Sequence, residues 1–166
     1  MKTLKTKFAI LLVTLLSISC SRSDDTPAAT TLPVANDNYI RCNVDGIAYE
    51  ALGAAVIADQ NSVAFNFRSD ISGGGTGIDV SVNGQAAVGT YTLNYSTAST
   101  AGRLNYRLSG DIYSSSICST SVGTLTITSK NNKTIIGTFS FSGKKILGCS
   151  NAAKVITTGT FKVTFP

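Results

Sequence analysis

The side chains that most enzymes use for chemistry are scarce in this chain of 166 residues. It contains no histidine and no tryptophan. The lack of histidine excludes Ser-His-Asp and Cys-His nucleophiles, histidine-ligated metal sites and the commonest general acid or base. The acidic loop pattern that binds calcium is also missing from the sequence. We therefore predict no catalytic residues, no metal site and no cofactor.

Carboxylates are the remaining candidates for catalysis. Glycoside hydrolysis needs two of them in one cleft, about 5 to 10 Å apart. The carboxylates to consider are Glu50, Asp59, Asp70, Asp79 and Asp111. They are scattered among predicted turns and strand faces, where such residues usually form turns or lie on the solvated surface. A carboxylate-based glycoside hydrolase is therefore an alternative, and we do not expect an enzyme.

Four cysteines complete the reactive side chains: Cys20, Cys42, Cys118 and Cys149. Cys118 precedes one arm of a predicted hairpin over about residues 122–142, and Cys149 follows the other arm. Folding about residues 131 and 132 brings these two ends together, so we predict a Cys118–Cys149 disulfide that stabilises the fold by roughly 3 to 4 kcal/mol. Cys42 shares a strand face with Ile40 and Val44 and is predicted to be a small buried hydrophobe. The alternative, a reactive thiol, lacks a histidine or lysine neighbour to activate it.

Tyrosine and arginine offer one possible binding surface. If a sheet face is exposed near an edge, Tyr106 with Arg103 and Arg107 could stack a sugar ring or hold a peptide. Tyr106 shares a strand face with Leu104 and Leu108, however, and an apolar face of this kind usually lies in the core.

The first twenty residues have the composition of an export signal. Lys2, Lys5 and Lys7 precede an apolar run over 8–16, which is too short to span a membrane and is typical of a secretory signal peptide. The run ends in Ser-Ile-Ser before Cys20, a pattern that resembles the relaxed lipobox of Bacteroidota lipoproteins. The resemblance implies a signal peptide over 1–19 and acylation of Cys20, which becomes the mature N-terminus. The alternative is an ordinary signal peptide with a chance cysteine.

Residues 20–38 are predicted to be the lipidated cysteine and a flexible spacer, because they are rich in Ser, Thr, Ala and Asp and show no apolar period. Residues 21–25, Ser-Arg-Ser-Asp-Asp, are similar to the short signal that sends such lipoproteins to the cell surface. The resemblance implies an outer-membrane protein anchored through its lipid. Removing 1–19 leaves 11 Lys and Arg against 9 Asp and Glu. Without a basic stripe, this charge predicts no nucleic-acid partner.

Residues 39–166 are predicted to form a single all-β domain. Apolar and polar residues alternate, as in half-buried strands. The pattern Gly-Thr-apolar-polar-apolar begins at Gly89, Gly123, Gly137 and Gly159. The spacings are irregular, so the pattern indicates recurring strand chemistry and no repeat array. About nine or ten short strands without a convincing helix predict an antiparallel β-sandwich or a flattened β-barrel.

Turn residues punctuate these strands. The pairs Asp45-Gly46 and Asn83-Gly84 are two-residue turn signals. The glycine-rich residues 72–77 lack the Gly-Lys-Ser/Thr ending of a phosphate loop and are predicted to be a hairpin tip. Residues 51–58 are small and apolar and could form a short helix. We expect a strand there, because Gly53 and the β-branched residues that follow count against a helix.

Four strand sequences carry a wider resemblance. They are Asn-Val-Asp-Gly from residue 43, Gly-Thr-Leu-Thr-Ile-Thr from 123, Ile-Gly-Thr-Phe-Ser-Phe from 136 and Thr-Gly-Thr-Phe-Lys-Val from 158. Together they resemble a family of small Bacteroidota lipoproteins that contain a domain of unknown function. The resemblance implies an all-β outer-membrane lipoprotein and brings no activity.

These observations favour a surface-anchored, non-catalytic β domain that binds a ligand or supports an envelope assembly. A glycan or a protein is the expected kind of ligand. Besides the hydrolase, one further alternative to this binding module is a carrier with a small-molecule cavity inside a β-barrel.

Overall fold

The computed structural model describes residues 37–60, 64–70, 75–85, 87–98 and 100–166, and these fold into one antiparallel sheet of eleven strands. The predicted signal peptide, Cys20 and most of the spacer lie outside the described residues. In the described part no helix is long and apolar enough to cross a membrane. The strands are β1 (Tyr39–Val44), β2 (Ile47–Leu52), β3 (Val56–Gln60), β4 (Ala64–Ser69), β5 (Gly77–Asn83), β6 (Gly89–Thr92), β7 (Gly102–Leu108), β8 (Asp111–Ser114), β9 (Val122–Lys130), β10 (Thr134–Lys145) and β11 (Lys154–Thr164).

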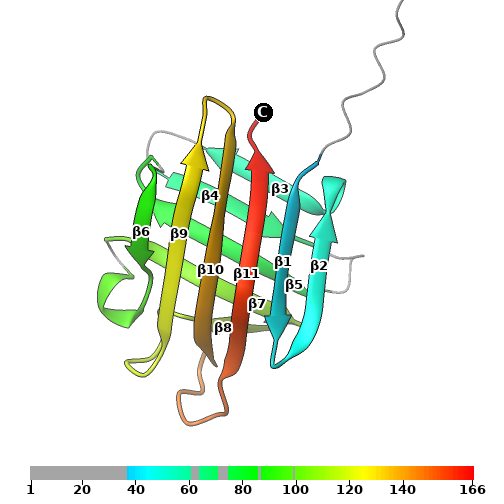
Figure 1. Ribbon diagram of the computed structural model, residues 1–166. Helices are drawn as coiled ribbons and strands as arrows, with labels where there is room; N and C mark the ends of the chain where they lie inside the picture. The colour runs from blue at the N-terminus through cyan, green and yellow to red at the C-terminus, as the bar shows by residue number, and fades with distance from the viewer. Residues whose placement is uncertain (1–36, 61–63, 71–74, 86, 99) are drawn as a thin grey trace, which may run out of the picture. The chain divides into compact units, whose positions relative to one another are not determined.

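The sheet folds over on itself into a nearly closed barrel with two layers. Figure 1 shows β6, β9, β10, β11, β1 and β2 side by side in front, with β8, β7, β5, β4 and β3 crossing behind them. The long strand β10 connects the layers, because it pairs with β9 and β11 along its length and with β8 at Lys144 and Lys145. The all-β, antiparallel prediction is confirmed, and the tertiary structure selects the barrel-like form.

The core lies between the two layers and is made by every second residue of the strands. Phenylalanine rings from both layers meet there: the centroids of Phe67 and Phe161 are 4.6 Å apart, and those of Phe65 and Phe165 are 5.1 Å apart. Such offset or tilted ring pairs add to the free energy gained by burying apolar area. The alternation seen in the sequence therefore decides which side of each strand faces inward.

The four Gly-Thr strands are neighbours in the front layer. Thr90, Thr126, Thr138 and Thr160 lie opposite one another in one row across the sheet. Thr90, Thr138 and Thr160 each follow the glycine of the pattern, whereas Thr126 lies three residues after Gly123. Because these threonines face outward, the glycine directly before each of the first three lies on the opposite side of its strand. There Gly137 is opposite Phe161, and a Cβ atom on Gly137 would lie 2.7 Å from that ring. Gly137 and Gly159 thus leave room for the rings of Phe161 and Phe139 on the adjacent strand.

The predicted turns have mixed outcomes. Asp45 and Gly46 both have positive φ (50° and 84°) and form the tight turn between β1 and β2, as expected. The predicted hairpin over 122–142 is confirmed as β9 paired with β10. Asn83-Gly84 is not a two-residue hairpin turn, because β5 pairs with β4 and β7 and the chain crosses to β6 in the front layer.

The segment 51–58 is only partly a strand. Its middle forms the 3-10 helix η1 (Gly53–Ala55), which separates β2 in the front layer from β3 in the back layer. Gly53 has a φ of 55°, which favours glycine and ends the extended run of β2. A second 3-10 helix, η2 (Tyr95–Thr97), follows β6.

Candidate functional site

The predicted disulfide is present. Cys118 and Cys149 are bonded, with their Cα atoms 5.7 Å apart. The bond connects the segment after β8 with the loop between β10 and β11. Cys42 is buried, and burial raises the pKa of its thiol to about 12. A thiol with that pKa stays protonated at neutral pH, so Cys42 has the properties of the buried hydrophobe that we predicted.

A polar groove lies on the outer face of the back layer. It has a volume of about 430 Å³ and crosses β3, β4, β5 and β7. Backbone and apolar atoms of Phe67, Val80 and Ile57 contribute to its floor. The polar residues that line it are Asp59, Asn66, Arg68, Asp79, Ser81, Arg103 and Asn105.

The register of the strands arranges these side chains in two rows. Asp59, Asn66, Ser81 and Arg103 are cross-strand partners in one row. Ile57, Arg68, Asp79 and Asn105 form the second row, two residues along each strand. Because side chains two apart share a face, all of them point away from the core. We call this set of two rows the groove.

One aspartate of the groove is held in place by an arginine. Arg107 Nε donates to both carboxylate oxygens of Asp79, at 2.9 and 3.2 Å, and Arg107 Nη2 donates to the carbonyl oxygen of Ser69 at 2.9 Å. Desolvation raises the pKa of Asp79, and the bond and charge of Arg107 oppose that rise. Gly77 leaves space for this arrangement, since a Cβ atom there would lie 2.7 Å from Arg107 Nη2.

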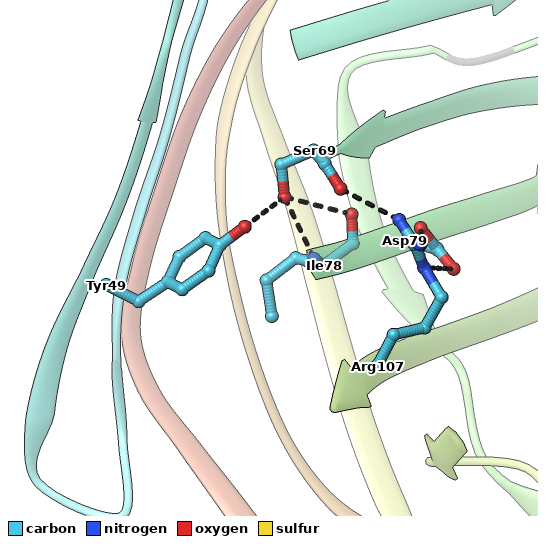
Figure 2. Close-up of polar contacts among 5 residues, drawn as sticks. All are labelled: Tyr49, Ser69, Ile78, Asp79 and Arg107. Atoms are coloured by element: carbon cyan, nitrogen blue, oxygen red, sulfur yellow. Dashed lines mark hydrogen bonds and ion pairs between the residues drawn. The ribbon is translucent and has the colours of Figure 1, made fainter. Parts of the chain in front are cut away.

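The same contacts continue from the outer face into the barrel wall. Figure 2 shows Tyr49 reaching from β2 to Ser69 at the end of β4, with its hydroxyl 2.7 Å from Ser69 Oγ. Ser69 is fully buried, and its Oγ accepts a bond from the Ile78 N–H at 2.9 Å. The regular β4–β5 pairing ends at Arg68 and Asp79. Beyond it, the Ser69 side chain takes the place of a backbone carbonyl as the acceptor for the Ile78 N–H. Through Ser69, the front layer supports the arginine that orients Asp79.

Other polar groups of the groove retain bonding capacity. The Oδ1 atom of Asn105 is enclosed and has no hydrogen-bond partner. Within the described residues, the side chains of Arg103, Asn66 and Ser81 also make no hydrogen bond. Buried polar atoms without partners are uncommon in folded proteins, because each one loses its bonds to water. The groove thus presents donors and acceptors that a ligand could satisfy.

The candidate binding set of Tyr106, Arg103 and Arg107 is not brought together as one surface. Tyr106 is 6% exposed and belongs to the core, whereas Arg103 and Arg107 point to the outer face. The reason is the period of two along β7, which places residue 106 opposite to 103 and 107. The expected core position of Tyr106 is confirmed, and both arginines belong to the groove region instead.

The five carboxylates considered above divide among several places. Asp59 and Asp79 both line the groove. Glu50 pairs with Arg41 on the front layer, and Asp111 pairs with Lys145 at 2.9 Å. Asp70 follows β4, and its Oδ1 atom is enclosed without a partner. In the described part of the chain, no three His, Cys, Asp or Glu side chains gather into a group that could hold a metal ion.

Most groove residues were missed by the sequence interpretation. Asn66, Arg68, Ser81 and Asn105 are the polar members of alternating strands, and alternation alone marks them as outward-facing. A signal was thus available for each strand separately. Chain order indicates that the consecutive strands β3, β4 and β5 are neighbours, but no local signal indicates that β7, which follows β6 in the chain, pairs with β5.

Comparison with known proteins gives a family for the chain. No curated protein and no solved structure matches it. The family model of DUF6252, described as a domain of unknown function, matches residues 36–164, which include every strand of the sheet. The chain therefore belongs to the family of DUF6252, a domain of unknown function.

Proposed function

We propose that this chain is a non-catalytic binding module that holds a glycan in the groove and is anchored by a lipid at Cys20 to the surface of a Bacteroidota outer membrane. The observation that carries the proposal is the gathering of hydrogen-bonding side chains with unused capacity on four neighbouring strands. A sheet face keeps such side chains in fixed positions, as a binding site requires.

The chemistry of the groove suits a ligand rich in hydroxyl groups. A sugar hydroxyl both donates and accepts hydrogen bonds. Arg103 and the amide of Asn66 supply donors, while the Asp59 carboxylate and the Ser81 hydroxyl supply acceptors. Ile57 is 46% exposed at one end of the second row and offers an apolar contact for a sugar ring.

The packing of the interior favours an outer site over a carrier cavity. Phe65, Phe67, Phe139, Phe161 and Phe165 fill the space between the layers with rings in mutual contact. Side chains packed at this density leave little space for a small molecule. The binding module is therefore our preferred function, and the carrier remains the weaker alternative.

Blocking the groove tests the proposal directly. We expect the purified chain to bind members of an oligosaccharide array and Ser81→Trp to abolish that binding, because the indole would fill the groove from β5. Thr138→Trp is the matched control, since Thr138 is exposed on the front layer. Equal loss in both variants, or no binding by the wild-type chain, would contradict the proposal. Release of new reducing ends from a bound oligosaccharide would show hydrolysis and overturn its non-catalytic part.

The anchor is tested separately. Cells that express the chain and are fed an alkyne-labelled palmitate should label the wild type and leave Cys20→Ser unlabelled. Protease added to intact cells should then remove the β domain. An unlabelled wild-type chain argues against the anchor, and a fully protected domain argues against surface exposure.

A further inference from the structure

The groove contains two arginines. Arg68 lies opposite Asp79 and acts on that carboxylate through its charge, whereas Arg103 pairs with a serine in the register. Arg103 is exposed at one end of the first row and forms no ion pair in the described part of the chain. The nearest acid in the register is Asp79, on the adjacent strand and two residues from Ser81, the partner of Arg103. Both oxygens of Asp79 already accept bonds from Arg107. The guanidinium of Arg103 therefore remains available to a ligand.

The other acids of the groove are distant from Arg103. Asp59 lies at the opposite end of the first row, three strands away, which corresponds to about 14 Å between Cα atoms. Asp70 acts on Asp79 through its charge but lies beyond the second row, roughly 16 Å from Arg103 by strand geometry. An anion at Arg103 would thus be separated from both of these carboxylates.

From these positions we infer that the ligand is an acidic oligosaccharide that lies along the first row, with a carboxylate at Arg103 and hydroxyl groups at Ser81, Asn66 and Asp59. This inference rests on the proposed function. The planar guanidinium fork matches a carboxylate with two parallel hydrogen bonds. At the other end, Asp59 accepts hydroxyl bonds and disfavours a second carboxylate. A row of about three strand spacings accommodates about three sugar units, which gives the site a direction as well as a charge preference.

Masking the carboxylate alone provides the test. The probes are glucuronosyl-xylobiose, a trisaccharide with a single carboxylate on its terminal ring, and its methyl ester, which has the same sugar rings and length. Binding is measured by isothermal titration calorimetry with the purified chain. We expect the acid to bind at least about tenfold more tightly than the ester, because charge-assisted hydrogen bonds exceed neutral ones by this order. The preference should decrease as salt increases.

Two arginine variants locate the effect. Arg103→Gln removes the charge but keeps a side-chain N–H donor, and it should reduce the preference for the acid to less than about threefold. Arg41→Gln on the front layer is the matched control, since Arg41 is an exposed arginine far from the groove in the strand order and should leave the preference unchanged. A preference that persists in Arg103→Gln would overturn the assignment.

The outcomes separate this inference from the proposed function. Equal binding of acid and ester, lost in Ser81→Trp, overturns the acidic ligand and leaves the glycan-binding function in place. Failure to bind either probe, while neutral oligosaccharides of the array bind, also overturns only the acidic ligand. Failure to bind any oligosaccharide overturns both.

Discussion

Replacing Ser69 by alanine is expected to destabilise the protein by about 2 to 4 kcal/mol. Ser69 is fully buried, and its Oγ is the partner of both the Ile78 N–H at 2.9 Å and the Tyr49 hydroxyl at 2.7 Å. Removing Oγ leaves the buried N–H group unsatisfied, which costs about 1 to 3 kcal/mol. Loss of the hydroxyl bond adds about 1 kcal/mol, because the half-buried Tyr49 can partly recover it with water.

Urea unfolding followed by circular dichroism measures this effect, with Ser81→Ala as the matched control. Ser81 lies on the outer face of β5 without a hydrogen-bond partner in the described chain, so its loss should change the free energy of unfolding by less than about 0.5 kcal/mol. A double-mutant cycle with Tyr49→Phe should give a coupling energy of about 1 kcal/mol. The reasoning is refuted if Ser69→Ala costs less than about 1 kcal/mol, or if Ser69→Ala and Tyr49→Phe are simply additive.

Three further perturbations test other parts of the structure. Replacing Cys118 and Cys149 together should lower the free energy of unfolding by about 3 to 4 kcal/mol, because the bond closes a loop of 31 residues; urea unfolding that differs by less than about 1 kcal/mol from the oxidised wild type would contradict this. Gly137→Ala should cost about 1 to 3 kcal/mol, because its Cβ would lie 2.2 Å from the carbonyl oxygen of Thr126; an unchanged Tm in a thermal scan would argue against this packing. Asp45→Asn should flatten the decrease of stability in acid, because hydrogen bonds from a lysine and a backbone N–H hold the pKa of Asp45 below its usual range. The wild-type carboxylate stabilises the fold above about pH 4 and loses that effect as the pH falls through the lowered folded-state pKa, and a urea titration repeated from pH 7 to pH 2 would record equal slopes if the carboxylate contributed nothing.

The disulfide illustrates what short sequence distances can determine. Cys118 and Cys149 flank a single hairpin, so one local turn is sufficient to bring them together. The same local logic predicts the tight turn at Asp45-Gly46, where both residues must take positive φ. The same reasoning is wrong at Asn83-Gly84. There a similar turn sequence leads from β5 in the back layer to β6, which pairs with β9 in the front layer.

The groove illustrates the opposite case. Each of its strands shows its outward side in the sequence through polar residues such as Asn66 and Ser81. The row is completed, however, by β7, which pairs with β5 although β6 lies between them in the chain. Arg103 and Asp59, for example, share one row only because β3, β4, β5 and β7 are adjacent. That adjacency depends on how the apolar faces of both layers fill a common core, which is a sum over long-range contacts.

By itself, therefore, the sequence determined the all-β class, the inward or outward side of most strand residues, and the cysteine pairing across one hairpin. The alternation of inward and outward residues and the preference of certain residues for turns both depend on only a few neighbouring residues. A local sequence pattern is therefore enough to predict them. Only the tertiary structure decided that β10 joins two layers, that Arg103 shares a groove with residues of β3, β4 and β5, and that Arg107 reaches Asp79 and Ser69 together. These features depend on the pairing of strands that are not consecutive in the chain, and the packing of the whole core determines that pairing.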